Sequence, residues 1–344
     1  MSIRSCVFCV MPFVVLLAAA GCRGSDNKAF DVVSEATYTV EEKWVTASDG
    51  NQIYTRWAYP ARGGPVFPAV IFVPSLLKSG GTAIEEASGA ALLKAGYAVV
   101  AFNPEGRGSN QPGDLKSDGV EDYDGFIDQD DLLKVIETAG TITYIDSGNV
   151  GVISSSFGIT MAAGCLGRHT ELNVKFLIDV EGPTDSYVSM GDAWMLDSDP
   201  ENDRFTDTSG TFLHASTAFD PSPANKIWWS EREGINYIGL INVPYMRIQG
   251  YWDHAQPPSE QYQTGFDVPP TWYQNKHAID MVNAATHGSS PWTCVNGSDL
   301  GNTPNALYSY EHPPAYYSGA LDPMSSDYAA IIVSVTKEMF ALNY

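Results

Sequence analysis

Short, continuously apolar runs alternate along the chain with longer amphipathic segments. Runs of strand length, without polar interruptions, are typical of strands that are buried on both faces of a sheet. Four such runs stand at 69–73, 97–102, 149–153 and 174–180. Between them, apolar residues recur at helical spacing in 83–95, 127–140 and 157–166. Strand and helix in alternation predict a mostly parallel sheet that helices cover on both faces.

The spacing of apolar residues differs in the segments before and after residues 69–180. Residues 37–45 and 53–59 alternate between apolar and polar around the turn at 48–51, which predicts an antiparallel hairpin. The later segments resume the strand and helix alternation. We expect helices at 226–240, 276–286 and 325–342, and strands at 244–249 and 291–295.

One stretch breaks this rhythm. Residues 186–225 are rich in Asp, Ser and Pro, and we interpret them as a lid-like insertion over the active edge of the sheet. The sequence therefore predicts one α/β domain over residues 36–344, with this insertion inside it.

The N-terminal segment indicates export. Arg4 precedes an apolar run, and residues 1–21 end in the small residues Ala19, Ala20 and Gly21. The stretch that ends in Cys22 resembles a bacterial lipobox, although Ala19 stands where Leu is usual. This resemblance implies lipidation of Cys22, with 22–35 as a polar tether, and an exported protein anchored to the cell envelope. Ordinary secretion with cleavage near Ala20 is the alternative.

The net charge and the cysteines of the chain limit the partners and disulfides that can be expected. The net charge is −22, so a nucleic-acid partner, which requires a basic face, is not expected. The acidic balance also argues against charge-driven adhesion to anionic lipid, which leaves the lipid on Cys22 as the expected membrane contact. Cys165 and Cys294 fall on elements far apart in the predicted sheet, and we expect both to be buried and unpaired.

The strongest chemical signal is the stretch Ser154-Ser155-Ser156-Phe157-Gly158, which lies between a buried strand and an Ala/Gly-rich helix. A tight strand-to-helix turn needs small residues two before and two after its centre. It presents the central hydroxyl above the sheet and directs the following N–H, that of Phe157, to the same place. We therefore interpret Ser156 as a nucleophile. The alternative is a Ser-rich turn that merely caps a helix.

The order of motifs resembles the α/β-hydrolase superfamily, in its esterase and serine-peptidase-like branch, over about residues 37–343. The matching pieces are the first hairpin, the loop 104–109 after the fourth strand, the turn at Ser156 and the segment 250–253 after the seventh strand. The resemblance implies an eight-stranded, mostly parallel sheet. It also implies that Asp253 orients the catalytic histidine, and that Leu76 provides the second oxyanion amide beside that of Phe157.

The resemblance requires a histidine after the last strand, and four candidates remain open. His312 is the preferred base because it lies on the loop that returns to the active edge. The alternates are His254, beside Asp253, His277 in the first turn of its helix, and His287. The last of these stands at the far end of the same helix. If His254 is the base, Glu181 or Asp185 becomes the expected acid in place of Asp253.

These residues predict a serine hydrolase that forms an acyl-enzyme on Ser156, with a small carboxylic ester as substrate. A serine peptidase or amidase of the same fold is the first alternative. The second is a surface lipoprotein that binds a ligand without turnover. We expect no cofactor and no metal, since the acidic run 197–203 lacks the glycine and the closing glutamate of an EF-hand.

Overall fold

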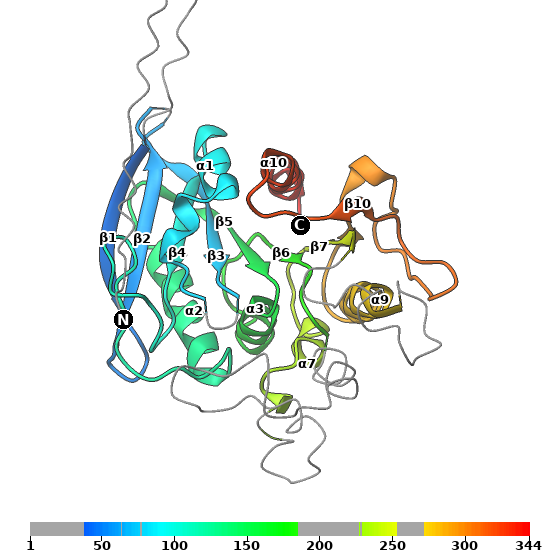
Figure 1. Cartoon of the computed structure of the whole chain (residues 1–344), viewed down its shortest axis with the longest axis horizontal. Helices are drawn as coiled ribbons and strands as arrows, with labels where there is room; N and C mark the ends of the chain where they lie inside the picture. Colours follow the sequence, from blue (N-terminus) through cyan, green and yellow to red (C-terminus); the bar gives the residue numbers. More distant parts are fainter. Residues whose placement is uncertain (1–37, 63, 76–77, 185–226, 228, 253–271) are drawn as a thin grey trace, which may run out of the picture. The chain divides into compact units, whose positions relative to one another are not determined.

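The computed structural model describes residues 38–62, 64–75, 78–184, 227, 229–252 and 272–344. These residues form an eight-stranded sheet in the order β1-β2-β4-β3-β5-β6-β7-β9 (Figure 1). The strands of the sheet are β1 Tyr38–Thr46, β2 Gln52–Pro60, β3 Phe67–Val73, β4 Ala98–Phe102, β5 Ile145–Ser155, β6 Phe176–Val180, β7 Tyr245–Ile248 and β9 Thr293–Val295. A second sheet of two strands joins β8, Gly250–Trp252, to β10, Tyr317–Ala320.

The sheet is parallel from β4 onward, and β1 and β2 are its antiparallel part. The first two strands form the predicted hairpin around Gly50, which has a positive φ of 99°. The central strands are buried along their length because side chains pack on both of their faces. The predicted α/β architecture with an eight-stranded, mostly parallel sheet is confirmed.

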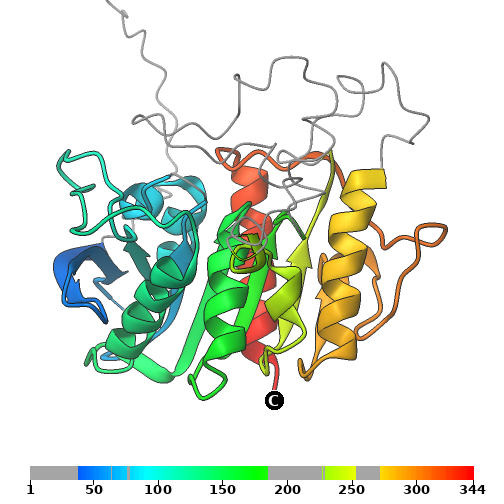
Figure 2. The same ribbon diagram turned by 90° about the horizontal axis from the view of Figure 1, so that it is seen from below.

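Helices cover both faces of the sheet. On one face, α1 (Ala87–Lys94) packs with α10 (Ser326–Ala341) in one apolar core. The other core contains α2 (Phe126–Ala139) and α3 (Gly158–Arg168). It also contains α7 (Ile235–Ile238) and α9 (Trp272–His287). Figures 1 and 2 show the two layers and bring the starts of α9 and α10 to the same edge of the sheet, at the top of Figure 2.

Several predicted boundaries differ from the observed ones. The expected helix 83–95 is a 3₁₀ turn, η1 (Gly81–Ile84), followed by α1 from Ala87. The expected helix 226–240 is interrupted before Gly234, and only α7 continues it in regular form. Pairing of β8 with β10 was not predicted, because strands this short have no readable alternation. The insertion at 186–225 lies outside the described residues.

Cys165 and Cys294 are both buried and free, as predicted. Among the described residues, no helix combines the length and the apolar character that crossing a membrane requires. Cys22 and the rest of residues 1–37 lie outside the described part of the chain.

Candidate active site

The turn around Ser156 has the geometry of a strained strand-to-helix junction. β5 ends at Ser155, α3 begins at Gly158, and Ser156 between them has φ 53°. A non-glycine residue in this left-handed region costs conformational energy, and such residues persist where surrounding contacts hold them. The Ser156 side chain is half-buried rather than enclosed in the core. A serine at the carboxyl end of a central parallel strand is thus held in a strained conformation with its side chain accessible.

Backbone hydrogen bonds fix this turn from both sides. The Ser156 N–H donates to the Val180 carbonyl at 2.8 Å, which extends the pairing of β5 with β6 by one residue. The Ser156 carbonyl in turn accepts from the Ile159 N–H at 3.2 Å, within the first turn of α3. The chain therefore passes from sheet to helix within two residues.

Gly158 allows the closest approach in the site. A Cβ atom added there would lie 2.4 Å from the Pro74 carbonyl oxygen, which is nearer than real Cβ contacts come. Pro74 and Ser75 follow β3, so the start of α3 touches the loop that was predicted to carry the second oxyanion donor. Leu76, the predicted donor, lies outside the described residues. The glycine two residues after Ser156 is thus required by packing against this loop.

Phe157 lies directly beside the candidate nucleophile. Its side chain is buried, and the residue occupies the N-cap position of α3. The N-terminus of a helix carries positive potential, because its first amide groups point outward along the axis. This end of α3 is therefore electrostatically suited to a developing negative charge near Ser156.

A buried carboxylate joins the carboxyl end of β6 to the first residue of β8. Glu181 follows β6 with φ 51° and only 1% exposure, and its Oε1 accepts a hydrogen bond from the Gly250 N–H at 3.0 Å. Glu181, one of the two alternative acids, thus has a structural role at the rim. β8 ends at Trp252, the residue before the predicted acid Asp253 in the sequence. Asp253, His254 and Asp185 themselves lie outside the described residues.

An ion pair below the rim was missed by sequence reasoning. Asp179 in β6 and Arg247 in β7 are neighbours in register, and both are fully buried. Arg247 Nη1 donates to Asp179 Oδ2 at 2.7 Å and to the Gly182 carbonyl at 2.5 Å. The Tyr245 hydroxyl donates to the same carboxylate oxygen at 2.7 Å, and burial beside that carboxylate raises the pKa of Tyr245 well above its usual value. The available signal was a charged residue within each of two otherwise apolar strand runs.

This ion pair holds the loop after β6 through Gly182. The Gly182 N–H donates to Asp179 Oδ1 at 3.0 Å, while its carbonyl accepts from Arg247. The Val180 carbonyl, at the end of β6, accepts a hydrogen bond from the Ser156 N–H. The loop that Asp179 and Arg247 hold therefore follows directly on the strand that pairs with the Ser156 turn. A buried pair of this kind is costly to break, since removal of one partner leaves the other charge uncompensated.

The loop after β4 is held by a second buried cluster. Arg107 Nη2 lies 2.7 Å from Glu121, 2.6 Å from Asp124 and 2.7 Å from Asp128. Its Nη1 makes a longer contact of 3.4 Å with the Ser75 carbonyl, so this cluster reaches the loop after β3. Burial raises the pKa of Asp124 to about 6 and raises that of Asp128 well above its usual range.

His312, the preferred base, lies on the loop after β9. It makes a bridge with Ser309, and its Nδ1 lies 3.4 Å from the Ser309 hydroxyl. The adjacent part of the loop binds α9 through Tyr308 with Asn283 and Tyr310 with Asp280.

Two strands, β6 and β7, separate β9 from β5 in the sheet. No hydrogen bond within the described part of the chain joins His312 to Ser156. The assignment of His312 as the base of Ser156 therefore stays a prediction.

The two histidines of α9 occupy opposite ends of the helix. His277 is in the second turn rather than the first, is fully buried, and its Nδ1 accepts from the Thr184 N–H at 3.0 Å. It therefore holds the segment that follows Glu181. His287 is the last residue of α9, and Figure 2 shows that this helix ends at the edge of the sheet opposite to the one where it begins. This agrees with the expected direction of the helix after a parallel strand.

Known structures share this architecture at low sequence identity. Acetyl xylan esterase 1 from a Thermoanaerobacterium species superposes with a TM-score of 0.55 at 14% identity, covering 89% of each chain. Est1E from Butyrivibrio proteoclasticus gives 0.51 at 15% identity, covering 86% of this chain and 96% of its own. A Bacteroides ovatus protein assigned as a dipeptidyl aminopeptidase IV gives 0.53 at 14% identity.

The last of these matches covers 90% of this chain but only 36% of the Bacteroides protein. This chain therefore spans about a third of that protein's length. At such identities the likeness establishes the α/β-hydrolase fold alone. None of the curated proteins matches the sequence.

The sequence itself matches a family model. Residues 86–265 fit the prolyl oligopeptidase family, and this segment runs from the start of α1 past Ser156 to the region that follows β8. The match contains the strained turn at Ser156, the buried pair of β6 and β7, and the predicted acid Asp253. On the basis of this match and of the fold, the chain belongs to the prolyl oligopeptidase family of α/β-hydrolases.

Proposed function

We propose that this protein is a serine hydrolase that transfers an acyl group from a carboxylic ester to Ser156 and then to water. The observation that carries this proposal is the φ of 53° at Ser156, in a two-residue junction between a central parallel strand and a helix N-terminus. A serine held in this conformation presents its hydroxyl and the next amide to a common point above the sheet.

The proposed chemistry follows from that placement. A histidine accepts the Ser156 proton while the serine oxygen attacks the ester carbonyl, and the resulting oxyanion is stabilised by backbone amides of Phe157 and Leu76. Collapse of this intermediate expels the alcohol, which takes its proton from the histidine. Water then repeats the two steps on the acyl-enzyme and releases the acid.

For the base we now prefer His254 over His312. The described contacts hold the loop of His312 against α9, whereas His254 is only two residues after the end of β8 in the sequence. Asp253 remains the proposed acid. If adjacency prevents His254 from using Asp253, the remaining candidates are Asp185 and Glu181, whose carboxylate already contacts the Gly250 amide.

The ester is preferred over the amide on the basis of relatives of similar length. Acetyl xylan esterase 1 and Est1E each align over most of their own chains, and the name of the first specifies an acetyl ester. The match to the prolyl oligopeptidase family supports the alternative, a peptidase or amidase. Both reactions pass through an acyl-enzyme on the serine. They differ in the group that leaves when it forms, which is an alcohol from an ester and an amine from an amide.

Labelling of the purified protein with a fluorophosphonate probe tests the nucleophile. We expect labelling of the wild type and of Ser155→Ala, a matched control in which the neighbouring serine is lost, and none of Ser156→Ala. The kcat/KM of Ser156→Ala should fall by about a thousandfold or more.

Rates on p-nitrophenyl acetate and on aminoacyl p-nitroanilides then separate an esterase from a peptidase. A folded wild-type protein that neither reacts with the probe nor turns over either substrate would instead support the non-catalytic binding lipoprotein.

We further propose that the mature protein is exported and anchored to the bacterial cell envelope by lipid on Cys22. Support comes from the apolar run and the small residues before this cysteine. Metabolic labelling with an alkyne fatty acid should mark the wild type and not Cys22→Ala, while Cys165→Ala should be labelled like the wild type. Equal labelling of the wild type and Cys22→Ala would refute the anchor.

A further inference from the structure

The cluster of Arg107 with Glu121, Asp124 and Asp128 contains more carboxylate than its cation can neutralise. Arg107 Nε donates to both oxygens of Glu121, at 2.9 and 2.8 Å, so Glu121 alone balances the guanidinium charge. Asp124 and Asp128 are both 0% exposed. If both were ionised, they would place two further negative charges in the interior, where a charge without a counterion is costly.

The arginines next to this cluster, in the described part of the chain, are paired with other carboxylates. Arg232, in the segment before α7, binds Asp122 at 2.5 Å and Glu231 at 3.2 Å. Its charge favours the ionised form of Asp124, but it is shared with these two partners. Arg168, on the neighbouring helix α3, pairs with Asp130 at 2.9 Å.

The other titratable groups around Asp124 and Asp128 are acids. Asp131 on α2 is buried, and its Oδ2 accepts the Glu105 N–H at 2.8 Å. Burial raises the pKa of both Asp124 and Asp128 above the usual range. The charge of Glu121 acts in the same direction, whereas that of Arg107 opposes it. The surroundings of the two aspartates therefore favour a protonated carboxyl.

The hydrogen bonds of the cluster show the same deficit of protons. Arg107 Nη2 has two hydrogens, but three carboxylate oxygens lie within 2.7 Å of it. The remaining oxygens of the pair, Asp124 Oδ2 and Asp128 Oδ1, are buried and accept no hydrogen bond from any group in the described part of the chain. A proton on one of these carboxyls supplies a donor and removes a charge at the same time.

The backbone that carries Asp124 is strained. Tyr123 has φ 54° and Asp124 has φ 63°, so two consecutive non-glycine residues are in the left-handed region. Hydrogen bonds to the cluster hold them there, because the Tyr123 N–H donates to Glu121 Oε1 at 2.8 Å and the Asp124 N–H donates to Asp128 Oδ2 at 2.7 Å. Repulsion between two ionised aspartates would act directly on this segment.

The strained segment contacts two parts of the fold near Ser156. Arg107 Nη1 lies 3.4 Å from the Ser75 carbonyl, on the loop after β3. Arg232 Nη2 donates to the Asp122 carbonyl at 2.6 Å, while the Arg232 carbonyl accepts from the Thr160 hydroxyl, in the first turn of α3, at 3.1 Å. A change in segment 121–125 therefore reaches the loop after β3 and the start of α3.

From these observations we propose that Asp124 and Asp128 together bind one proton at neutral pH. Loss of this proton at alkaline pH leaves two ionised carboxylates beside one nitrogen, and their repulsion opens segment 121–125. The contacts of Arg107 with Ser75 and of Arg232 with Asp122 then weaken. This pH-sensitive switch does not rest on the proposed hydrolysis.

Infrared spectroscopy detects the proton directly, because the carbonyl of a protonated carboxyl absorbs apart from a carboxylate. The full-length Asp131→Asn protein is the background, since the pKa of Asp131 is also raised, to about 8. We expect a protonated-carboxyl band at neutral pH that disappears as the pH is raised to about 10. Absence of this band at neutral pH would overturn the proposal.

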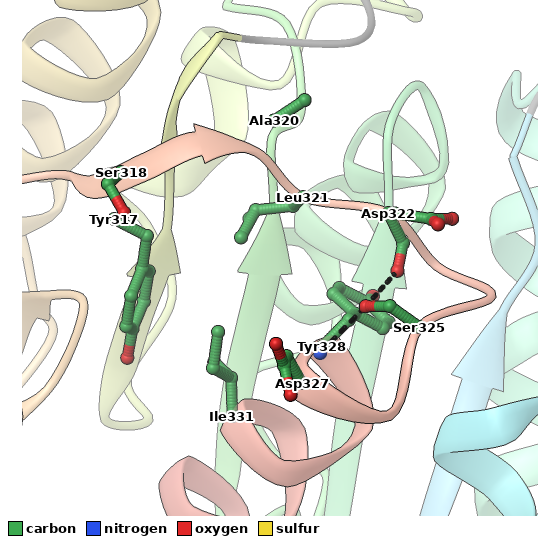
Figure 3. A pocket seen from close by; sticks show the side chains of 9 residues that line it. All are labelled: Tyr317, Ser318, Ala320, Leu321, Asp322, Ser325, Asp327, Tyr328 and Ile331. Carbon is green, nitrogen blue, oxygen red and sulfur yellow. Dashed lines mark hydrogen bonds between the residues drawn. The ribbon is translucent and has the colours of Figure 1, made fainter.

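Variants in the same background locate the proton. Asp124→Asn and Asp128→Asn should each abolish the band, because the single carboxylate that remains is ionised beside Arg107. Asp322→Asn is the matched control and should keep it. Asp322 is an exposed carboxylate in the wall of a cavity between β10 and α10, and Figure 3 shows it pointing away from the other side chains there. A band that survives in Asp124→Asn or Asp128→Asn refutes the shared proton.

Hydrogen exchange measured by mass spectrometry tests the opening of segment 121–125. After correction for the intrinsic dependence of exchange on pH, we expect exchange in this segment of the wild type to rise about tenfold between neutral pH and pH 10. Asp128→Asn should stay protected, because its amide does not ionise, and Asp322→Asn should behave as the wild type. An equal rise in the wild type and Asp128→Asn would show that the proton does not control the segment.

Discussion

The backbone amide of Ser156 donates to the carbonyl of Val180 at 2.8 Å, so the candidate nucleophile is the last residue of its strand to remain paired with the neighbouring strand. One residue later the chain has left the sheet, and Gly158 begins α3. The strain at Ser156 is therefore maintained by three neighbours: β6, the loop after β3 and the helix itself.

Gly158→Ala should disturb the support from the loop after β3. The added Cβ would lie 2.4 Å from the Pro74 carbonyl oxygen, so α3 and that loop must separate. We expect a loss of about 1–3 kcal/mol in the free energy of unfolding, as for other overpacked sites, together with a lower kcat. Gly148→Ala, at an exposed position of β5 where an added Cβ meets nothing nearer than 3.5 Å, is the control. Chemical denaturation and ester turnover of both variants measure the difference; equal behaviour would show that the close approach is not required.

Arg107→Met should destabilise the protein strongly. The variant leaves Glu121, Asp124 and Asp128 without their shared cation, and two of these carboxylates are fully buried. The expected cost is about 3–5 kcal/mol in urea or guanidinium unfolding, because an uncompensated buried charge remains. Lys134→Met removes one member of an exposed pair with Glu137, and we expect it to change stability by less than about 0.5 kcal/mol.

Asp131→Asn should flatten the dependence of stability on pH. Burial raises the pKa of Asp131 to about 8, while its Oδ2 accepts the Glu105 N–H at 2.8 Å. Between the unfolded pKa near 4 and the folded pKa near 8, the native state holds a proton that the unfolded state has lost. The contribution of Asp131 to stability is therefore full below pH 4 and falls as the pH rises to 8.

The amide of the Asn variant keeps an acceptor for Glu105 but does not ionise. Thermal unfolding at pH 4.5 and pH 8 should show the variant gaining several degrees in Tm relative to the wild type at the higher pH. Asp130→Asn, on the same helix and only half-buried, should show no such gain. A constant difference in Tm between the wild type and Asp131→Asn at the two pH values would contradict the raised pKa.

The histidine candidates can be ranked by single substitution. If His254 is the base, His254→Ala should lower kcat/KM by about a thousandfold or more, and His312→Ala should leave it within about twofold. His287→Ala, at the opposite edge, should behave as the wild type. His277→Ala should reduce stability, because the Thr184 N–H then loses its buried acceptor. A large loss of turnover in His312→Ala alone would restore the original assignment.

The local sequence determined the elements of this protein and the turn that carries its candidate nucleophile. Continuous apolar runs identify β3, β4, β5 and β6, because strands buried on both faces have no polar side to show. Small residues around Ser156 identify the turn, because steric limits on a tight junction act within five consecutive residues. Neither inference requires knowledge of which segments meet in space.

Only the tertiary structure decided which distant side chains meet. Asp179 and Arg247 are 68 residues apart and form a buried pair because β6 and β7 lie in register. The loop that carries His312 contacts α9 through Tyr308 and Tyr310, and these contacts were not predicted from the sequence. Periodicity reports the face of an element, whereas the course of a long loop depends on hydrogen bonds to partners that the local sequence does not specify.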